Sequence, residues 1–195
     1  RPPPAGPSSL IIGPSTPLWL EAEDDLAEAF DRAGFGVAAK SYKVSPSTAY
    51  VQTPATFTIS SDGLYTVDYF SADVSGNVEA IQASSVAVDA TPPLLTFTVV
   101  GPRQVDRLGR VIVSTATDLA LSATDPVAAG LASGVGSLRW TLNGGAESFV
   151  LAASTSLRLP EGRWTLSARA LDRVENASLI FTTSVIVEAS PPVFG

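Results

Sequence analysis

The chain has 195 residues, of which 45% are hydrophobic and 16% charged, so it is too apolar for a disordered segment and long enough for two ordinary domains. It contains no Cys and no His, which excludes disulfides, thiolate zinc sites, cysteine nucleophiles and a Ser-His-Asp arrangement. Its net charge of −7 disfavours nucleic acid and anionic membrane surfaces as partners, whereas acidic side chains suit Ca²⁺.

No apolar run approaches the roughly 18 residues of a membrane span, and no signal-peptide pattern opens the chain. The absence of Met predicts that the sequence is an excerpt of a longer protein.

The two halves of the chain repeat each other, and from Asp62 to Glu161 the offset is 99 residues. Three matches share this offset: residues 62–67 (DGLYTV) with 161–166 (EGRWTL), Asp73 and Asn77 with Asp172 and Asn176, and 88–93 (VDATPP) with 187–192 (VEASPP). A common offset over about 30 residues predicts one structural unit present twice.

The match continues toward the N-terminus with small slips, which we attribute to insertions in loops. The matched segments are 16–24 with 117–125, Gly36-Val37 and Tyr42 with Gly134-Val135 and Trp140, and Ile12-Gly13-Pro14 with Val100-Gly101-Pro102.

Proline pairs mark the predicted domain boundaries at Pro3-Pro4, Pro92-Pro93 and Pro191-Pro192. Proline fixes φ and keeps its predecessor extended, so each pair predicts a short, stiff spacer. We therefore expect domains over residues 1–91 and 92–190, with a further linker or module beginning at 191–195.

Period-two alternation of apolar and polar residues predicts strands throughout the chain. Leu18, Leu20 and Ala22 alternate with polar or exposed positions, and the second half repeats this at 119–123. The other predicted strands lie at 8–12, 37–44, 55–60, 64–69, 79–88, 94–100, 110–115, 136–142, 155–159, 163–168 and 178–187. About seven short strands per repeat predict two tandem immunoglobulin-like β-sandwich domains. Residues 24–32 instead favour a short helical turn, with Leu26 and Phe30 on one face.

The run Asp62-Gly63-Leu64-Tyr65, then Asp73 to Asn77, then 88–93, resembles the bacterial immunoglobulin-like repeats of secreted and cell-surface proteins. The resemblance covers nearly the whole chain, twice, and implies an extracellular, non-catalytic module. Asp62-Gly63-x-Tyr65 also resembles the tyrosine corner of the fold. The second repeat departs from the pattern at Trp164, which excludes a phenol hydrogen bond, and at Glu175 in place of Gly76, which predicts a different or strained turn.

The sandwich topology is expected to bring Asp89, Asp125 and Asp172 together at one pole of the second domain, where the three carboxylates would suit a Ca²⁺ ion that stiffens the junction, as in cadherin-type repeats. The alternative is that Asp125 and Asp172 cap their own turns. In the first domain Arg1 takes the place of Asp89 and would repel a cation.

The remaining candidate sites match no specific sequence pattern for chemistry or lie where another role is expected. The acidic run formed by Glu21, Glu23, Asp24, Asp25, Glu28 and Asp31 fits either a solvated loop or a site for Ca²⁺ or a basic partner, and it lacks the spacing of a calcium loop. No pair of acids is singled out for glycoside hydrolysis. Asn176-Ala177-Ser178 fits the glycosylation triplet, but Asn176 already has a role in a turn.

Trp19 and Phe70 fall on the outward faces of their predicted strands, as does Leu64. Exposed aromatic rings are able to stack on sugars or dock another protein, and the alternative is packing under a loop or a neighbouring module.

The sequence therefore favours a non-catalytic structural or adhesive stalk module of a secreted or cell-surface protein, whose partners are the neighbouring modules of the same chain. The alternatives are a carbohydrate- or protein-binding accessory module of a secreted hydrolase and a subunit of an extracellular filament. An enzyme is the least favoured class.

Overall fold

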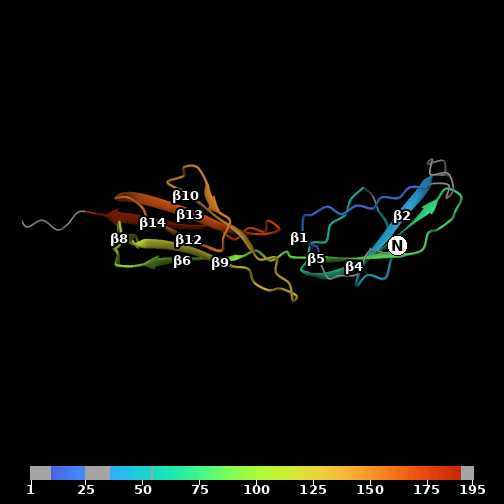
Figure 1. Cartoon of the computed structure of the whole chain (residues 1–195), viewed down its shortest axis with the longest axis horizontal. Helices are drawn as coiled ribbons and strands as arrows, with labels where there is room; N and C mark the ends of the chain where they lie inside the picture. Colours follow the sequence, from blue (N-terminus) through green and yellow to red (C-terminus); the bar gives the residue numbers. More distant parts are fainter. Residues whose placement is uncertain (1–9, 25–35, 54, 190–195) are drawn as a thin grey trace, which may run out of the picture. The chain divides into compact units, whose positions relative to one another are not determined.

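The computed structural model describes residues 10–24, 36–53 and 55–189, and within these ranges the chain is all-β (Figure 1). It divides into two compact units, of which unit 1 ends at Ala90 and includes Ala128–Leu131, and unit 2 begins at Thr91. The helical turn expected at 24–32 falls, apart from Asp24, outside the described residues. In the part of the chain that is described, no helix has the length and apolarity to cross a membrane.

Unit 2 is a sandwich of two sheets with strand orders β11-β10-β13-β14-β8-β7 and β12-β9-β6. Its strands are β6 (Leu94–Val100), β7 (Arg103–Val105), β8 (Val111–Ser114), β9 (Asp118–Thr124), β10 (Val135–Leu142), β11 (Ser148–Val150), β12 (Ser154–Leu157), β13 (Gly162–Asp172) and β14 (Phe181–Glu188). Both sheets contribute to the core, in which Leu119 and Leu121 of β9 and Leu166 of β13 are at most 1% exposed.

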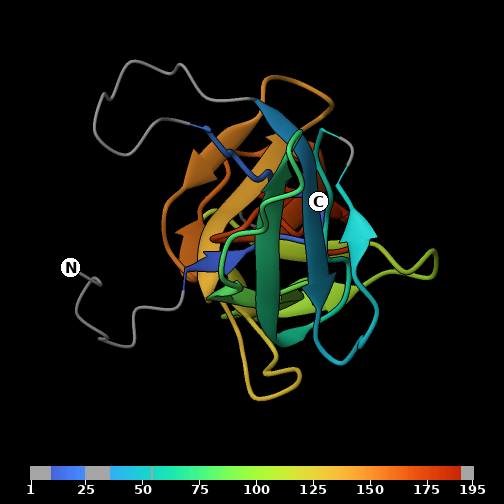
Figure 2. The ribbon, with the colours of Figure 1, turned by 90° about the vertical axis from the view of Figure 1, so that its right-hand side faces the viewer.

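Unit 1 contains a five-stranded sheet with the order β1-β5-β4-β2-β3. Its strands are β1 (Ile11–Ile12), β2 (Val37–Val44), β3 (Val51–Gln52), β4 (Gly63–Asp73) and β5 (Gln82–Val88). Figure 2 gives a second view, in which β2 (blue) and β3 (cyan) lie side by side at one edge of this sheet. The order reproduces β8-β14-β13-β10-β11 of unit 2, so both units are built on the same sheet.

Irregularities recur as well as strands. The β2–β4 ladder shifts register after Val37, which pairs with Asp73, and the β10–β13 ladder shifts after Val135, which pairs with Asp172. Such bulges bend a strand and re-aim its side chains. In both units the bulge lies opposite the aspartate that ends the long strand, which is Asp73 in β4 and Asp172 in β13.

The position of β1 corrects one of the sequence matches. Ile12 pairs in parallel with Val88, as Val113 of β8 pairs in parallel with Val187. The counterpart of β1 is therefore β8, and the match of Ile12-Gly13-Pro14 to the end of β6 is wrong. Strand pairing decides the equivalence, whereas a shared Gly-Pro pair reports only a local turn.

The second layer of unit 1 is much smaller than predicted. In place of strands over 18–22 and 55–60, the described residues form a single antiparallel bridge between Leu18 and Phe57, whose backbone groups exchange hydrogen bonds of 2.8 and 2.9 Å. Phe57 stacks on Tyr42 of β2 with ring centroids 4.0 Å apart, which closes this end of the core. No described residue of unit 1 takes the place that β6 has beside β9.

The corner before each long strand is held by one aromatic donor. The Tyr65 hydroxyl donates to the Ser61 carbonyl at 3.2 Å, and the Trp164 indole N–H donates to the Pro160 carbonyl at 3.0 Å. Gly63 has φ +154°, and a Cβ there would lie 3.2 Å from the Tyr65 ring, so glycine lets the ring cross the backbone. The absence of a phenol in unit 2 was foreseen, but the indole makes the same bond.

Loss of the indole donor is expected to weaken unit 2. Trp164→Phe leaves the Pro160 carbonyl without this partner, and we expect the free energy of unfolding to fall by about 1 kcal/mol. Denaturant unfolding monitored by circular dichroism measures this change. Trp19→Phe is the matched control, because Trp19 is 60% exposed. An equal effect of the two substitutions would contradict the role given to the corner.

Candidate functional site

The residues predicted as metal ligands are brought together. Asp89 follows β5, Asp125 follows β9 and Asp172 ends β13, and one carboxylate oxygen of each lies within 4.8 Å of the other two. Asp89 is 0% and Asp172 3% exposed, and Asp125 is half-buried. We call these residues the aspartate cluster.

Two members of the aspartate cluster also organise their own loops. Asp172 Oδ1 accepts the backbone N–H groups of Val174 and Asn176 at 2.9 and 2.8 Å, and Oδ2 accepts the Asn176 side-chain amide at 2.6 Å. Asp125 Oδ2 accepts the Gly134 N–H at 2.6 Å. The turn-capping roles considered from sequence are therefore present.

Unit 1 has the same two caps. Asp73 accepts the backbone N–H and side-chain amide of Asn77 at 2.8 and 2.6 Å, and Asp24 accepts the Gly36 N–H at 2.8 Å. The side-chain hydrogen bond from Asn77 lowers the pKa of Asp73 below its ordinary value. Arg1, the predicted counterpart of Asp89, lies outside the described residues.

Capping does not exhaust what the cluster is able to bind. An ionised carboxylate has about four lone-pair sites, so Asp172 retains acceptor capacity after its three hydrogen bonds. Three carboxylates so close and so little exposed repel one another, because burial weakens the screening by water. A hard divalent cation with oxygen ligands would relieve this repulsion, and Ca²⁺ accepts ligands in flexible geometry.

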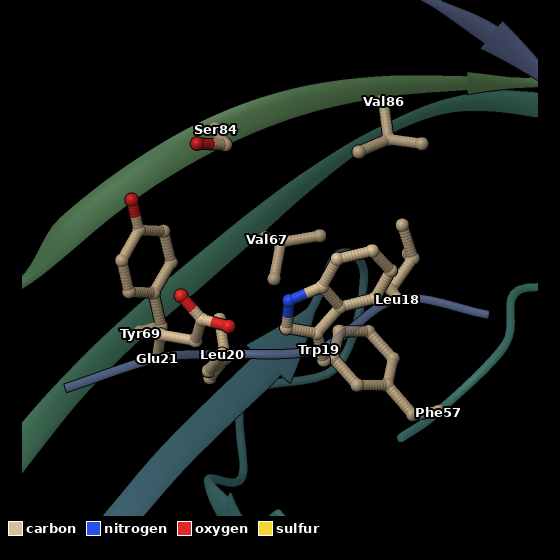
Figure 3. A pocket seen from close by; sticks show the side chains of 9 residues that line it. All are labelled: Leu18, Trp19, Leu20, Glu21, Phe57, Val67, Tyr69, Ser84 and Val86. Carbon is tan, nitrogen blue, oxygen red and sulfur yellow. The ribbon is translucent and has the colours of Figure 1, made fainter. Parts of the chain in front are cut away.

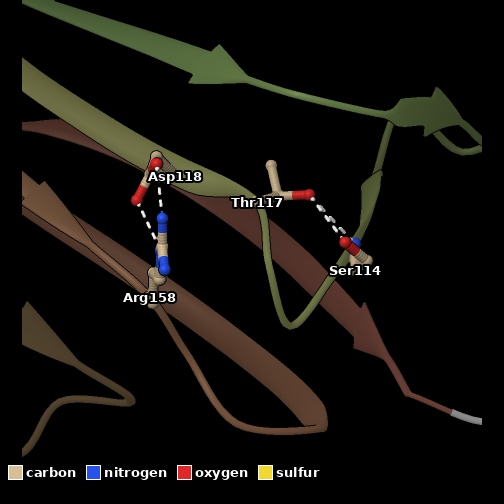
Figure 4. Close-up of polar contacts among 4 residues, drawn as sticks. All are labelled: Ser114, Thr117, Asp118 and Arg158. Carbon is tan, nitrogen blue, oxygen red and sulfur yellow. Dashed lines mark hydrogen bonds and ion pairs between the residues drawn. The ribbon is translucent and has the colours of Figure 1, made fainter.

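Other acidic residues of unit 2 are neutralised by arginines instead of lying next to further carboxylates. Arg158 donates to both carboxylate oxygens of Asp118, at 2.8 and 3.1 Å, across the pair formed by β9 and the end of β12 (Figure 4). This hydrogen bonding lowers the pKa of Asp118, as the hydrogen bonds from Arg110 and Arg169 lower the pKa of Asp106 and Glu147 respectively. A general acid in glycoside hydrolysis needs a raised pKa, so these carboxylates do not fit that role.

The same region shows how a polar turn is fixed in unit 2. The hydroxyl groups of Ser114 and Thr117 lie 3.1 Å apart (Figure 4). The Thr117 hydroxyl also donates to the Pro102 carbonyl at 3.2 Å. Thr117 is 2% exposed, so its polar atom is satisfied inside the unit. It therefore holds the turn between β8 and β9.

The two aromatic residues proposed for binding do not form one strip. Trp19 is 60% exposed and lines a groove, whereas Phe70 is half-buried and packs edge-on against Tyr50 at 5.1 Å. Tyr69 lines the same groove as Trp19, so its neighbour Phe70 points to the opposite face of β4. Only Trp19 is available at the groove.

The groove itself was not anticipated from sequence. It has a volume of about 270 Å³ and lies between the segment 18–21 and the inner face of β4 and β5. In Figure 3 the Trp19 indole lies between Leu18 and Phe57 on one side and Val67 on the other, with Glu21 beside Tyr69. We call this the Trp19 groove; its lining is Leu18, Trp19, Leu20, Glu21, Phe57, Val67, Tyr69, Ser84 and Val86.

The acidic run and the glycosylation triplet are only partly visible. Asp25, Glu28 and Asp31 lie outside the described residues, Asp24 serves as a cap, and Glu21 lines the Trp19 groove. In the triplet, the Asn176 amide is bonded to Asp172, and the Ser178 hydroxyl accepts the Ala170 N–H at 2.9 Å. Glu175 has φ 70°, close to the 89° of Gly76, so the turn is kept at the cost of a left-handed non-glycine residue.

Comparisons with known proteins leave the chain without an assigned family. No protein-family description and no curated protein matches it. The fibronectin(III)-like modules of Clostridium thermocellum CbhA match with 14% identity and a TM-score of 0.45, over 93% of this chain and 90% of that one. SGBP-B of the Bacteroides ovatus mixed-linkage glucan utilization locus, in complex with a mixed-linkage heptasaccharide, matches with 12% identity and a TM-score of 0.25, over 95% of this chain and 69% of that one. Scores this low carry no argument, and the all-β assignment rests on the strands themselves.

Proposed function

We propose that the chain is a non-catalytic, load-bearing structural module of a secreted or cell-surface protein. The observation that supports this is the parallel pair that the last strand of each unit forms. In unit 1, β1 is parallel to the last strand β5, and in unit 2, β8 is parallel to the last strand β14. We call these the terminal parallel pairs.

A terminal parallel pair resists stretching because of its direction. Tension applied through the chain pulls β1 backward and β5 forward in unit 1. In unit 2 it does the same to β8 and β14 once β6 and β7 have detached, so that in both units the parallel neighbours are sheared along their length. All hydrogen bonds of the pair are then loaded together, whereas an antiparallel hairpin pulled at one end opens one bond at a time. Forced unfolding depends on the unfolding rate, and this geometry keeps that rate low.

The alternatives retain separate support. A carbohydrate- or protein-binding accessory module is favoured by the exposure of Trp19, since an indole face is able to stack on a sugar ring. A subunit of a filament would use the sheet edges, which are templates for pairing with another chain. Neither alternative accounts for a parallel terminal pair in both units.

Stretching the whole chain from its two ends should give two force peaks, the first from unit 1. The β1–β5 register covers two residue pairs, and the β8–β14 register covers four, so fewer bonds resist shear in unit 1. Single-molecule force spectroscopy measures both peaks. Insertion of about ten glycines between Gly144 and Gly145 lengthens the step of unit 2 by roughly 35 Å and identifies it.

The control changes only the direction of pulling. The chain contains no Cys, so a cysteine pair introduced at Glu161 and Glu188 offers unique attachment points. These positions load the antiparallel β13–β14 ladder from its Gly162–Val187 end. We expect a peak several-fold lower than for end-to-end pulling. Equal peaks in the two directions, or no peak in either, would overturn the load-bearing function.

A second proposal concerns the aspartate cluster, which we propose to bind Ca²⁺. The convergence of Asp89, Asp125 and Asp172 within 4.8 Å supports it. Calcium sites of extracellular modules have Kd values of about 0.1–1 mM. Binding to the folded state alone at 10 mM would then add roughly 1.4–2.7 kcal/mol to the free energy of unfolding.

Thermal unfolding in CaCl₂ and in EDTA tests the calcium proposal. We expect calcium to raise the Tm of the wild type and of Asp73→Asn, but not that of Asp172→Asn. The two variants lose the same kind of turn cap, and only Asp172 belongs to the aspartate cluster. If calcium leaves the wild-type Tm unchanged, or stabilises all three proteins equally, the aspartates serve as caps without a metal.

A further inference from the structure

The outward face of the larger sheet of unit 2 carries two arginines that are held by one glutamate. On β10, Leu138 packs in the core, so its neighbour Arg139 points to the opposite face. On β13, Ala168 packs in the core and Arg169 points outward in the same way. The two arginines pair in the β10–β13 ladder, and they donate to separate oxygens of Glu147, Arg139 at 3.2 Å and Arg169 at 2.9 Å. We call these three residues the arginine triad.

The arginine triad keeps a positive charge and most of its hydrogen-bond donors. The hydrogen bond from Arg169 is the main cause that lowers the pKa of Glu147, so this carboxylate stays ionised and two cations against one anion leave a net charge of +1. Each guanidinium gives one N–H to Glu147 and retains the rest of its fork of donors. The Nε–H of Arg139 is buried and has no acceptor among the described residues. The side chains of Arg139 and Arg169 are 36% and 38% exposed, so a second carboxylate is able to reach them.

A pocket of about 270 Å³ lies beside the arginine triad on this face. Glu147 and Arg169 line it, together with Thr141 of β10 and Ser167 of β13, which pair with each other in the ladder. Ser167 in turn pairs with Thr182 of β14, and their hydroxyl groups lie 3.0 Å apart. Hydroxyl side chains therefore lie side by side on three neighbouring strands, next to the charges. A hydroxyl group both donates and accepts, as the hydroxyl groups of a sugar do.

Exposed apolar side chains lie on both sides of the two arginines. Phe149 of β11 pairs with Arg139 and is 64% exposed, and it faces outward because its neighbour Val150 packs against the core. Ile180, which precedes β14, is 67% exposed and lines the pocket with Arg169. Apolar surface beside a few charged and polar groups is typical of a ligand site, and it suits the apolar face of a sugar ring.

The position on a sheet face distinguishes between kinds of anionic ligand. β10 and β13 each have a neighbouring strand on both sides, so their backbone groups are used in ladders and an extended peptide finds no strand edge here. A sugar needs only side chains as partners. Glu147 shows the chemistry that the arginines favour, since each guanidinium binds one oxygen of its carboxylate, and the planar fork of arginine matches a carboxylate.

We propose that the outward face of unit 2 binds a glycan built of sugars that carry a carboxylate, that is, uronic acid residues. The carboxylate of one sugar accepts N–H groups of Arg139 and Arg169. The hydroxyl groups of the same sugar bond to Ser167, and the apolar face of its ring lies against Ile180. This site is separate from the Trp19 groove, and the proposal goes beyond the load-bearing function and does not depend on it.

The same face of unit 1 has the frame without the charge. Phe70 stands at the position of Arg169 and packs edge-on against Tyr50 with ring centroids 5.1 Å apart. Lys43 on this face is paired with Asp68 at 3.1 Å, which leaves no net charge. The proposed site therefore belongs to unit 2 alone among the described parts of the two units.

The probe is the trisaccharide of galacturonic acid, titrated into the ¹⁵N-labelled full chain in about 100 mM NaCl with EDTA, which removes calcium from the experiment. We expect saturable shifts of the amide signals of residues 139–141, 147–149 and 167–169, with a Kd of about 1 mM or lower. Arg169→Gln should weaken binding at least about tenfold, because it removes a charged donor. Arg163→Gln is the matched control, since it removes the same charge from the same face of β13, roughly 20 Å away, and it should change the Kd by less than about twofold.

A second comparison changes the ligand and leaves the protein intact. The methyl ester of the trisaccharide has the same rings and hydroxyl groups without the negative charges, and it should bind at least about fivefold more weakly than the acid. Circular dichroism and Tm values confirm that each variant folds, and the ester comparison needs no variant.

Several outcomes would overturn the proposal. The first is no saturable shift with the trisaccharide up to about 10 mM, well above the expected Kd. The second is an equal loss of binding in Arg169→Gln and Arg163→Gln, which would mean attraction to charge in general. The third is equal binding of the acid and its ester. A hexaglutamate peptide that binds as tightly as the trisaccharide, with the same dependence on Arg169, would instead identify a site for acidic polypeptides.

Discussion

The apolar face of a sheet must be covered by a second layer, and the two units differ in how they meet this constraint. Unit 2 satisfies it with β6, β9 and β12, so that Leu121, Leu138 and Leu166 are 0% exposed. Unit 1 has the same principal sheet but covers it with the Leu18–Phe57 bridge and the Tyr42–Phe57 stack. The apolar surface left over is the Trp19 groove. The cover is incomplete at Tyr69 and Val86, which are half-buried, whereas Val67 in the same groove is 4% exposed.

In both units the last strand forms a parallel pair, and the proposed mechanical role rests on this feature. The same sheet order, the same bulge and the same aspartate caps recur, so the repeated sequence builds a repeated frame. Within that frame the details differ by chemistry: an indole replaces a phenol at the corner, and Glu175 takes the left-handed position of Gly76. A repeat thus tolerates substitutions that preserve a donor or a backbone conformation.

Most of the strands could be predicted from sequence, because period-two alternation marks a strand with one buried face. Residues 37–44 were predicted with the bounds of β2, and the long strands β4 and β13 followed from the repeat. The two- and three-residue strands β3, β7 and β11 were missed, since so few residues show no period. The strands expected at 18–22 and 55–60 were wrong for a different reason. Alternation indicates only that a segment favours the β conformation, whereas a strand also needs a neighbouring strand with which to form hydrogen bonds.

The aspartate cluster was placed from sequence by combining the repeat with the topology of a sandwich, which brings loops from distant positions to one pole. The capping bonds of Asp125 and Asp172 were foreseen as an alternative. The Trp19 groove was not foreseen, and the match of Ile12-Gly13-Pro14 to the end of β6 was wrong. The offset of 101 residues between Leu18 and Leu119, extended to Ile12 and Val113, would have corrected that match.

The central claim is that β6 covers one edge of β9 in unit 2, whereas no described residue pairs with the equivalent edge of unit 1, and amide hydrogen exchange measures this directly. The amides of Ala120 and Ser122 lie in β9, which is paired on both sides, and those of Trp19 and Glu21 lie at the open edge. We expect Ala120 and Ser122 to exchange on the order of a hundredfold or more slowly than Trp19 and Glu21. Equal protection of the two pairs would mean that a strand already covers this edge of unit 1, and would contradict the account.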